Sequence, residues 1–270
     1  MPTSRERVRK VPEVTAYFWI ITILVSGEGE TVADALNTDW HVGVAHATWL
    51  IGGTLVLALT AQFTLNRYVP TVYWLAVVLA STVGTLFTEN LMTDFEIPLP
   101  VLAAMFTVVV LSVFAVWYAV ERTASIDSVV TVRRESFYWV AILGTFALGT
   151  VLTRLLVGRF GTGYLGAALI AAAATCGFGA LFYGVNLHAT TAFWDVLVLT
   201  QSLGGMPGRP PESRWHDRRL AIGATAASIL IGIGVVGLIW FLTASKVDKM
   251  LPETYGEFRP RPRFQKGSAP

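Results

Sequence analysis

Three carboxylate side chains stand at the end of an apolar segment, where they could bind a proton or a cation. Glu28, Glu30 and Asp34 follow the run FWIITILVSG, which begins at residue 18. A charged side chain inside a bilayer is costly, and such residues usually face a bundle interior or a water-filled pathway. The segment is therefore either no membrane helix, or a membrane helix whose acids have a task.

The surroundings of these acids recur along the chain. An aromatic-Trp pair occurs four times, and each Trp is followed by a glycine ten residues later and by a charge fifteen residues later. The four sets are Trp19, Gly29 and Asp34; Trp74, Gly84 and Glu89; Trp139, Gly149 and Arg154; and Trp194, Gly204 and Arg209. The regular spacing indicates a two-helix unit that doubled twice. Because each unit crosses the membrane twice, four parallel repeats in a pseudo-fourfold arrangement are expected.

Helical geometry places part of each set on one face. At about 100° per residue, the positions eleven and fifteen after a Trp lie about 20° and about 60° from it. Trp19, Glu30 and Asp34 then share a face, and Glu28 lies on the opposite face. If that face turns inward in all four repeats, the repeated charges converge on a shared centre.

The charges at this centre allow two interpretations. Repeats in sequence order would set Asp34 opposite Arg154 and Glu89 opposite Arg209. Glu28 and Glu30 lie outside that count, and we expect them to be protonated or to bind a cation. One interpretation is a buried salt-bridge ring that fixes helix register. The other is a polar pathway or binding site for an ion or small solute.

The other repeated residues have structural explanations. The four repeat Trp residues lie near one predicted membrane interface, where an aromatic belt is favoured over ligand stacking. The four repeat glycines predict close helix packing or a local break.

The composition favours a membrane protein over a water-soluble one. Of 270 residues, 54% are hydrophobic and 14% are charged, against about 25% charged in soluble domains. At about 20 apolar residues per span, eight spans are predicted in an all-α polytopic membrane helix bundle. They lie near 13–35, 43–65, 71–92, 98–120, 136–157, 163–187, 190–206 and 219–243.

One membrane domain, 12–243, is expected between cytoplasmic tails at 1–11 and 244–270. Its repeats fall at approximately 12–69, 70–122, 132–187 and 188–243. With both termini inside, the inner segments carry 14 of the 20 Lys and Arg residues. The positive-inside rule then predicts a multi-pass protein of the inner (plasma) membrane with cytoplasmic termini.

The first repeat resembles an uncharacterised family of bacterial integral membrane proteins built of four tandem repeats of a domain of unknown function. That family has two membrane helices and a characteristic Trp in each repeat. Its first repeat reads F-W-x-x-K-x-L and then G-E-T-x-x-D, matched here by FWIITIL and GETVAD. The resemblance spans residues 12 to about 243 and implies the fold and repeat number, but little about activity. This chain departs from the family pattern at Thr22, where Lys is usual, and at Arg154 and Arg209, where acids are usual.

Other chemistry finds little support in the sequence. The single cysteine, Cys176, excludes a disulfide framework and a Cys-based zinc site within one chain. No two of the four histidines pair at metal-ligand spacing on one helix, and no nucleophile-base-acid set is evident. The segment GEGET lacks the Lys and the strand-to-helix context of a phosphate loop. We therefore expect no catalytic residues, no cofactor and no nucleic-acid partner, and we leave the identity of any metal open.

These observations favour a transporter or exporter of a cation or small solute. Its path would run through the polar centre formed by the odd-numbered helices, with the lipid bilayer as the surrounding partner. The alternative is a non-transporting structural or interaction protein whose intramembrane charges form a salt-bridge ring. The sequence leaves the oligomeric state open.

Overall fold

A computed structural model describes residues 9–160, 163–185, 189–204 and 224–245, and in these ranges the secondary structure is entirely helical. The elements are α1 (Ala16–Asp34), the π-helix η1 (Ala35–Asp39), α2 (Val44–Thr64), α3 (Pro70–Thr93), α4 (Leu99–Glu121), the 3-10 helix η2 (Ile126–Ser128), α5 (Val132–Phe160), α6 (Gly163–Val185), α7 (Ala189–Gly204) and α8 (Ala224–Ser245). The eight α-helices match the eight expected segments to within a few residues.

Five helices within the described ranges are long and apolar enough to cross a membrane. They are Val44–Thr64, Pro70–Thr93, Leu99–Glu121, Val132–Arg159 and Thr225–Ser245. Helix α1 is not among these five, because its acids make it less apolar. Helix α7 has only 16 residues, whereas about 20 residues are needed to span a bilayer core. The chain is thus compatible with a multi-pass membrane protein.

Local signals explain where several helices begin. The Thr15 hydroxyl accepts a hydrogen bond from the backbone amide of Phe18 and caps α1. Pro70 and Pro100 occupy the first or second positions of α3 and α4, where proline removes only an amide that has no helical partner. Gly43, with φ of +80°, makes the turn into α2.

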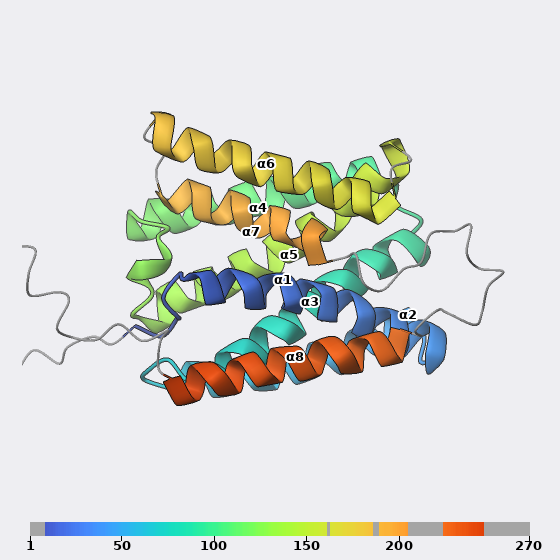
Figure 1. The fold of residues 1–270 in the computed structure, drawn as a ribbon, viewed down its shortest axis with the longest axis horizontal. Coiled ribbons are helices and arrows are strands. Elements are labelled where there is room, and N and C mark those ends of the chain that lie inside the picture. The colour runs from blue at the N-terminus through green and yellow to red at the C-terminus, as the bar shows by residue number, and fades with distance from the viewer. Residues whose placement is uncertain (1–8, 161–162, 186–188, 205–223, 246–270) are drawn as a thin grey trace, which may run out of the picture.

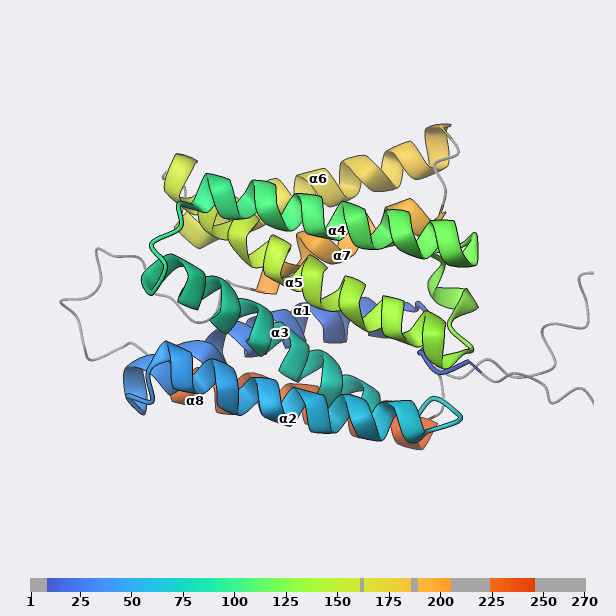
Figure 2. The same ribbon diagram turned by 180° about the vertical axis from the view of Figure 1, so that it is seen from behind.

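The odd-numbered helices form the interior of the bundle. Helix α1 contacts α3, α3 contacts α5, α5 contacts α7, and α7 contacts α1, which closes a ring. The even-numbered helices lie outside, and each packs on the following odd-numbered one: α2 on α3, α4 on α5, α6 on α7, and α8 on α1. Figure 1 shows α6, α7, α1 and α8 from one side, and Figure 2 shows α4, α5, α3 and α2 from the other.

The outer helices present apolar side chains to their surroundings. Leu57 on α2, Val108 on α4 and Ile233 on α8 are each more than 60% exposed. Such surfaces suit lipid, because a hydrocarbon environment makes no demand for polar groups. The inner helices α3 and α5 are mostly buried, so their polar residues face protein.

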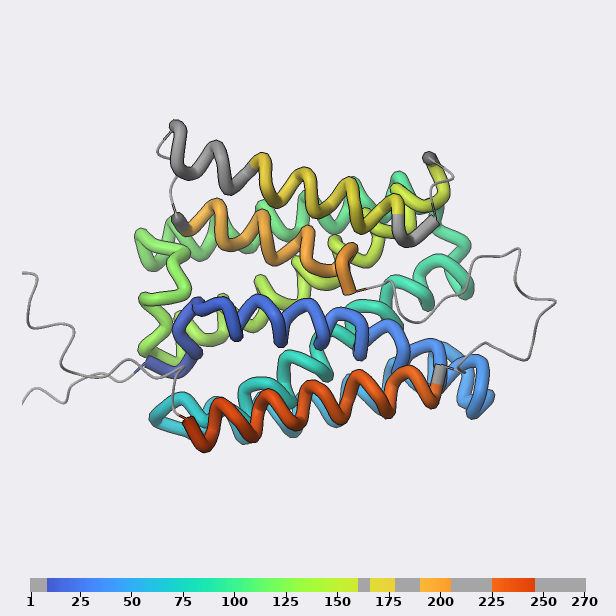
Figure 3. Tube along the Cα trace, viewed as in Figure 1, coloured from blue at the N-terminus to red at the C-terminus, as the bar shows by residue number. Residues whose placement is uncertain are grey.

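The helices alternate in direction along the chain. In Figure 3, α1 runs from left to right and α8 runs back from right to left. The start of α1 and the end of α8 therefore lie at the same end of the bundle. We call this end, near which the repeat Trp residues lie, the collar end, and we call the opposite end, where the repeat charges lie, the charged end.

Candidate functional site

The four repeat glycines lie at the four contacts that close the ring. Each glycine faces a backbone segment of the next odd-numbered helix, four to eight residues after the repeat Trp of that helix. A Cβ atom added to the glycine would meet backbone there: Gly29 at 2.9 Å from the Ser81 carbonyl carbon, Gly84 at 3.2 Å from the Ala147 nitrogen, Gly149 at 2.7 Å from the Val198 oxygen, and Gly204 at 2.5 Å from the Gly27 nitrogen. Close packing, one of the two expectations for these residues, is confirmed.

The aromatic-Trp pairs form a second closed set of contacts, one or two turns into each odd-numbered helix. In every case the residue before one Trp packs on the Trp of the next helix. The ring centroids are separated by 5.6 Å for Phe18 and Trp74, 5.6 Å for Tyr73 and Trp139, 5.9 Å for Tyr138 and Trp194, and 5.6 Å for Phe193 and Trp19. These separations are typical of favourable aromatic pairs. We call the eight residues the aromatic collar.

The aromatic-belt interpretation of the Trp residues is wrong for three of them. Trp74, Trp139 and Trp194 are at most 5% exposed, whereas a belt residue meets lipid headgroups. The Trp194 indole donates to the carbonyl of Ala124, but the indole nitrogens of Trp74 and Trp139 have no hydrogen-bond partner among the described residues. The collar is thus an internal layer that closes one end of the ring.

At the charged end, Arg154 lies beside Glu89 of the neighbouring helix. The Arg154 Nη2 and Glu89 Oε2 atoms are 3.8 Å apart, an ion-pair distance that is longer than a hydrogen bond. Arg154 also approaches the sulfur of Met92 at 3.7 Å. The expected diagonal pairing of Arg154 with Asp34 is therefore replaced by a pairing between adjacent helices. Arg209, the fourth repeat charge, lies outside the described residues.

The acids of α1 fall into two groups. Glu30 is buried and Asp34 is half-buried; their helical offset from Trp19 puts them on the face that the repeats turn inward. Glu28 is buried against the outer helix α8, where Ser228 donates a hydrogen bond of 2.8 Å to its Oε1 atom. Gly232 leaves room for this carboxyl, since a Cβ there would stand 3.3 Å from Oε1. Glu28 is therefore separate from the ring centre, as its position on the helix predicts.

Hydroxyl and amide groups without partners gather on the inner helices between the collar and the charges. Most helical Thr residues here donate to the carbonyl four residues earlier, as Thr82 and Thr153 do. Among the hydroxyl and amide side chains of the odd-numbered helices, as far as the structure describes them, buried atoms of five residues have no hydrogen-bond partner: Ser81, Thr85 and Thr88 on α3, Thr150 on α5 and Gln201 on α7. Buried polar atoms in proteins are rarely left in this state. We call these five the polar layer.

The polar layer extends over about two helical turns, because Ser81 and Gln201 stand seven residues after their Trp and Thr88 stands fourteen residues after its Trp. Thr85 and Thr150 both stand eleven residues after their Trp, the position that Glu30 has on α1. At 1.5 Å per residue this is about 16 Å beyond the collar, with the Glu89 position about 22 Å beyond it. Along the ring, the aromatic collar comes first. The polar layer and Glu30 follow, and the charged position of Glu89 and Arg154 comes last.

The donor set does not resemble a resident metal centre. No group of three or more His, Cys, Asp and Glu residues that could hold a metal ion occurs within the described ranges. The oxygen donors of the polar layer suit hard cations or hydrogen-bonding solutes better than soft metals.

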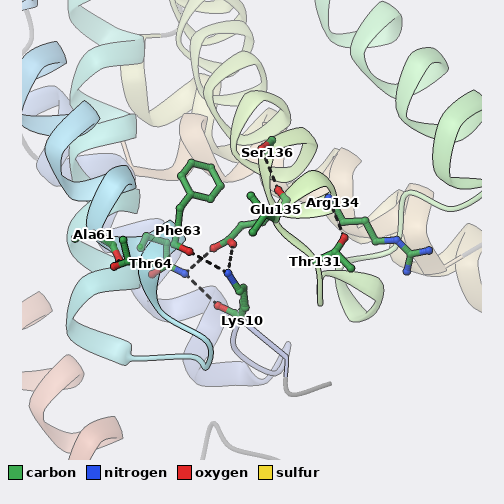
Figure 4. Close-up of polar contacts among 10 residues, drawn as sticks. Lys10, Ala61, Phe63, Thr64, Thr131, Arg134, Glu135 and Ser136 are labelled. Atoms are coloured by element: carbon green, nitrogen blue, oxygen red, sulfur yellow. Dashed lines mark hydrogen bonds and ion pairs between the residues drawn. The ribbon is translucent and has the colours of Figure 1, made fainter. Parts of the chain in front are cut away.

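A buried network at the collar end was missed by the sequence analysis, which placed residues 1–11 in a tail. The Lys10 ammonium donates to Glu135 Oε2 at 2.8 Å and to the carbonyl of Phe63 at 3.3 Å, and Gln62 donates to Glu135 Oε1 at 3.0 Å (Figure 4). All three side chains are buried. The one available signal was Glu135, four residues before Trp139 and so on the same helical face.

Comparison with known proteins finds a repeat that is similar to two segments in the first half of the chain. Residues 17–68 and 72–123 each match the model of a Repeat of Unknown Function (DUF347). These two segments contain α1 with α2 and α3 with α4, close to the expected repeats at 12–69 and 70–122. No curated protein and no solved structure matches the chain. These matches are consistent with an uncharacterised repeat family, and the description of the repeat names no activity.

Proposed function

We propose that this chain is a multi-pass inner-membrane protein of four two-helix repeats around a pseudo-fourfold axis, and that it transports a cation or small solute along that axis. The cyclic glycine contacts and the cyclic collar contacts support the repeat number. The basic residues described at the collar end, among them Arg67, Arg122 and Arg133, support a cytoplasmic location of that end.

The single observation that carries the transport proposal is the polar layer. Hydroxyl and amide groups that neither bond to each other nor back-bond to their helix are disposed to bind something that enters the ring. A dry structural core would be expected to satisfy them, because each unsatisfied buried polar atom costs about 1–3 kcal/mol. Glu30 at the same depth adds an acidic group suited to a cation.

In this proposal each layer has a role. The polar layer binds the solute, Glu89 and Arg154 set the charge at the entrance from the charged end, and the aromatic collar is the closed gate towards the cytoplasm. Alternating access would then require the collar to open. Pathways at repeat interfaces near the middle of the membrane are common in secondary transporters.

The experiment compares solute accumulation in cells with and without the gene, with Mg²⁺, Mn²⁺, K⁺ and a panel of small organic amines as probes. A difference for one of these probes is expected, and the double variant T85V/T150V, which keeps shape but removes two hydroxyls, should abolish it. The matched control is T60V, because the exposed Thr60 hydroxyl bonds to the carbonyl of Val56 on the outer helix α2. Equal accumulation for every probe, or retention by the double variant, contradicts the proposal.

The alternative function, a non-transporting membrane scaffold, is favoured by one observation. Glu89 and Arg154 bring opposite charges together at a contact between two inner helices, which could serve helix register alone. In that case T85V/T150V would fold normally and leave every measured phenotype of the cell unchanged.

A further inference from the structure

A pocket of about 780 Å³ lies between α4, α5 and α7, on the outer side of the helix ring. Polar side chains of its lining gather where α4 ends and α7 begins: Tyr118, Arg122, Thr123, Thr190, Thr191 and Asp195. Towards the other end the wall is mostly apolar, with Val110, Leu111 and Leu199 among its residues. The pocket thus has a polar head and an apolar body.

Asp195 is out of place on this surface. It stands directly after a repeat Trp, a position at which the other three repeats carry Ile20, Leu75 and Val140, each about half exposed. Those residues suit contact with lipid, whereas a carboxylate in the same position does not. Asp195 is half-buried and makes no hydrogen bond or ion pair with the described residues.

The dimensions of the pocket fit an elongated small molecule. Its lining on α4 extends from Thr107 to Arg122, which is about 22 Å along a helix axis. A volume of about 780 Å³ falls within the about 300–1,000 Å³ of small-molecule sites.

From this geometry we propose that the pocket binds a single-tailed amphiphile with an ammonium head group, which enters sideways from the membrane. The ammonium donates to the Asp195 carboxylate and to the hydroxyls of Thr190 and Thr191, and the tail lies along α4. Trp194 and Phe114, whose ring centroids are 5.0 Å apart, also line the pocket, and aromatic side chains attract a nearby cation. Arg122 also belongs to the polar head, but it is exposed, so that solvent and salt weaken its repulsion of the ammonium. This site is separate from the ring centre and does not depend on the transport proposal.

The test is equilibrium binding of dodecylammonium and of neutral 1-dodecanol to the full chain in phosphatidylcholine nanodiscs, with empty discs subtracted. We expect binding of dodecylammonium, a loss of about tenfold or more in D195N, and retention in D195E, while dodecanol binding is the same in wild type and D195N. Wild-type binding no greater than in empty discs, or unchanged dodecylammonium binding in D195N, overturns the proposal.

A second pair of variants keeps the test decisive if Asp195 variants fail to fold. L111W fills the pocket from α4 and should weaken binding of both probes, whereas V109W, on the same helix but outside the lining, should weaken neither. Full binding in L111W overturns the proposal. The same measurement in discs that contain phosphatidylethanolamine tests whether a two-chain lipid occupies the pocket. Weaker dodecylammonium binding in these discs would show that this lipid competes for the site and would overturn the single-tailed ligand proposed here.

Discussion

The two ends of the helix ring each hold a buried ion pair, and the two pairs are built differently. At the collar end, Lys10 and Glu135 are hydrogen-bonded at 2.8 Å, and Gln62 and a backbone carbonyl complete their shells. At the charged end, Glu89 and Arg154 are 3.8 Å apart, and Glu89 Oε2 and two Arg154 nitrogens have no hydrogen-bond partner among the described residues. The first pair is joined by a hydrogen bond, whereas the second pair shares none and leaves three of its polar atoms without a hydrogen-bond partner among the described residues.

The same contrast extends to the repeats themselves. At the collar end all four repeats contribute an aromatic residue and a Trp, and the contacts close with nearly equal spacings. At the charged end the described repeats contribute an aspartate, a glutamate and an arginine at one helical position. Packing is thus repeated, and chemistry is varied. This division fits the proposal made above, in which the collar end closes the ring and the charged end faces the solute.

The largest effect should come from K10M. It leaves the Glu135 carboxylate buried without its cation, and removal of one partner from a buried pair costs about 3–5 kcal/mol. We expect a large fall in the unfolding temperature in detergent, with partial recovery in K10M/E135Q. The control is R9M, because the Arg9–Asp127 pair is exposed on the Asp127 side and such pairs contribute at most about 1 kcal/mol. Similar melting of both variants would remove the special role of the Lys10 network.

A smaller loss is expected from G204A. The new methyl group would meet the backbone nitrogen of Gly27 at 2.5 Å, and overpacking of this kind costs about 1–3 kcal/mol. G234A provides the control, since no atom lies within 4 Å of a Cβ at that position. Chemical or thermal unfolding of the two variants measures the difference. If G204A melts like G234A, the ring contact between α7 and α1 is not as described.

We expect E89Q to lower solute accumulation more than it lowers stability, whereas K10M should mainly lower stability. Because Glu89 and Arg154 share no hydrogen bond, the substitution removes only a longer-range attraction, and the fall in melting temperature should be smaller than in K10M. Accumulation of the solute identified for the wild type should nevertheless decline strongly. An E89Q protein that is as unstable as K10M, or as active as wild type, would erase the distinction between the two pairs.

The smallest effect concerns Asp39, the last residue of the π-helix η1. In the structure its carboxylate accepts hydrogen bonds from the hydroxyl and the backbone amide of Thr225, at the start of α8. These bonds, the hydroxyl first, lower the pKa of Asp39. The stabilisation is therefore present above the ordinary Asp pKa of about 4 and is lost as the pH falls through the lowered value. D39N should melt slightly below wild type at pH 7, and this gap should narrow as the pH falls below about 4; a gap that stays constant as the pH falls would contradict this.

Much of the fold follows from the sequence, because the length of each apolar run indicates where a membrane helix begins and ends. The segment expected at 163–187 is α6 at Gly163–Val185, and that expected at 190–206 is α7 at Ala189–Gly204. The Trp, glycine and charge offsets also predicted which faces of the odd-numbered helices meet. Glu28 lies apart from the centre for the same geometric reason.

The failures have a common physical cause. In a membrane protein both the lipid-facing and the buried faces are apolar, so a Trp near a helix end fits either place, and Trp74 proved to be internal. The partner of a charged side chain is also hard to predict from sequence. Arg154 pairs with Glu89 of the adjacent helix and not with a diagonal acid, since adjacent odd-numbered helices pack closely at the repeat glycines. Lys10 looked like a topology signal, since its partner Glu135 is 125 residues away.

The central claim, that water and solute reach the polar layer, is tested most directly by thiol labelling. In a C176S background, single cysteines at Thr85, at exposed Thr38 and at lipid-facing Val108 are treated in open membranes with a small, water-soluble methanethiosulfonate reagent. Thiolates form and react only where water has access. If water fills the polar layer, T85C and T38C should be labelled and V108C should not. An inert T85C beside a reactive T38C would contradict it and favour a sealed structural core.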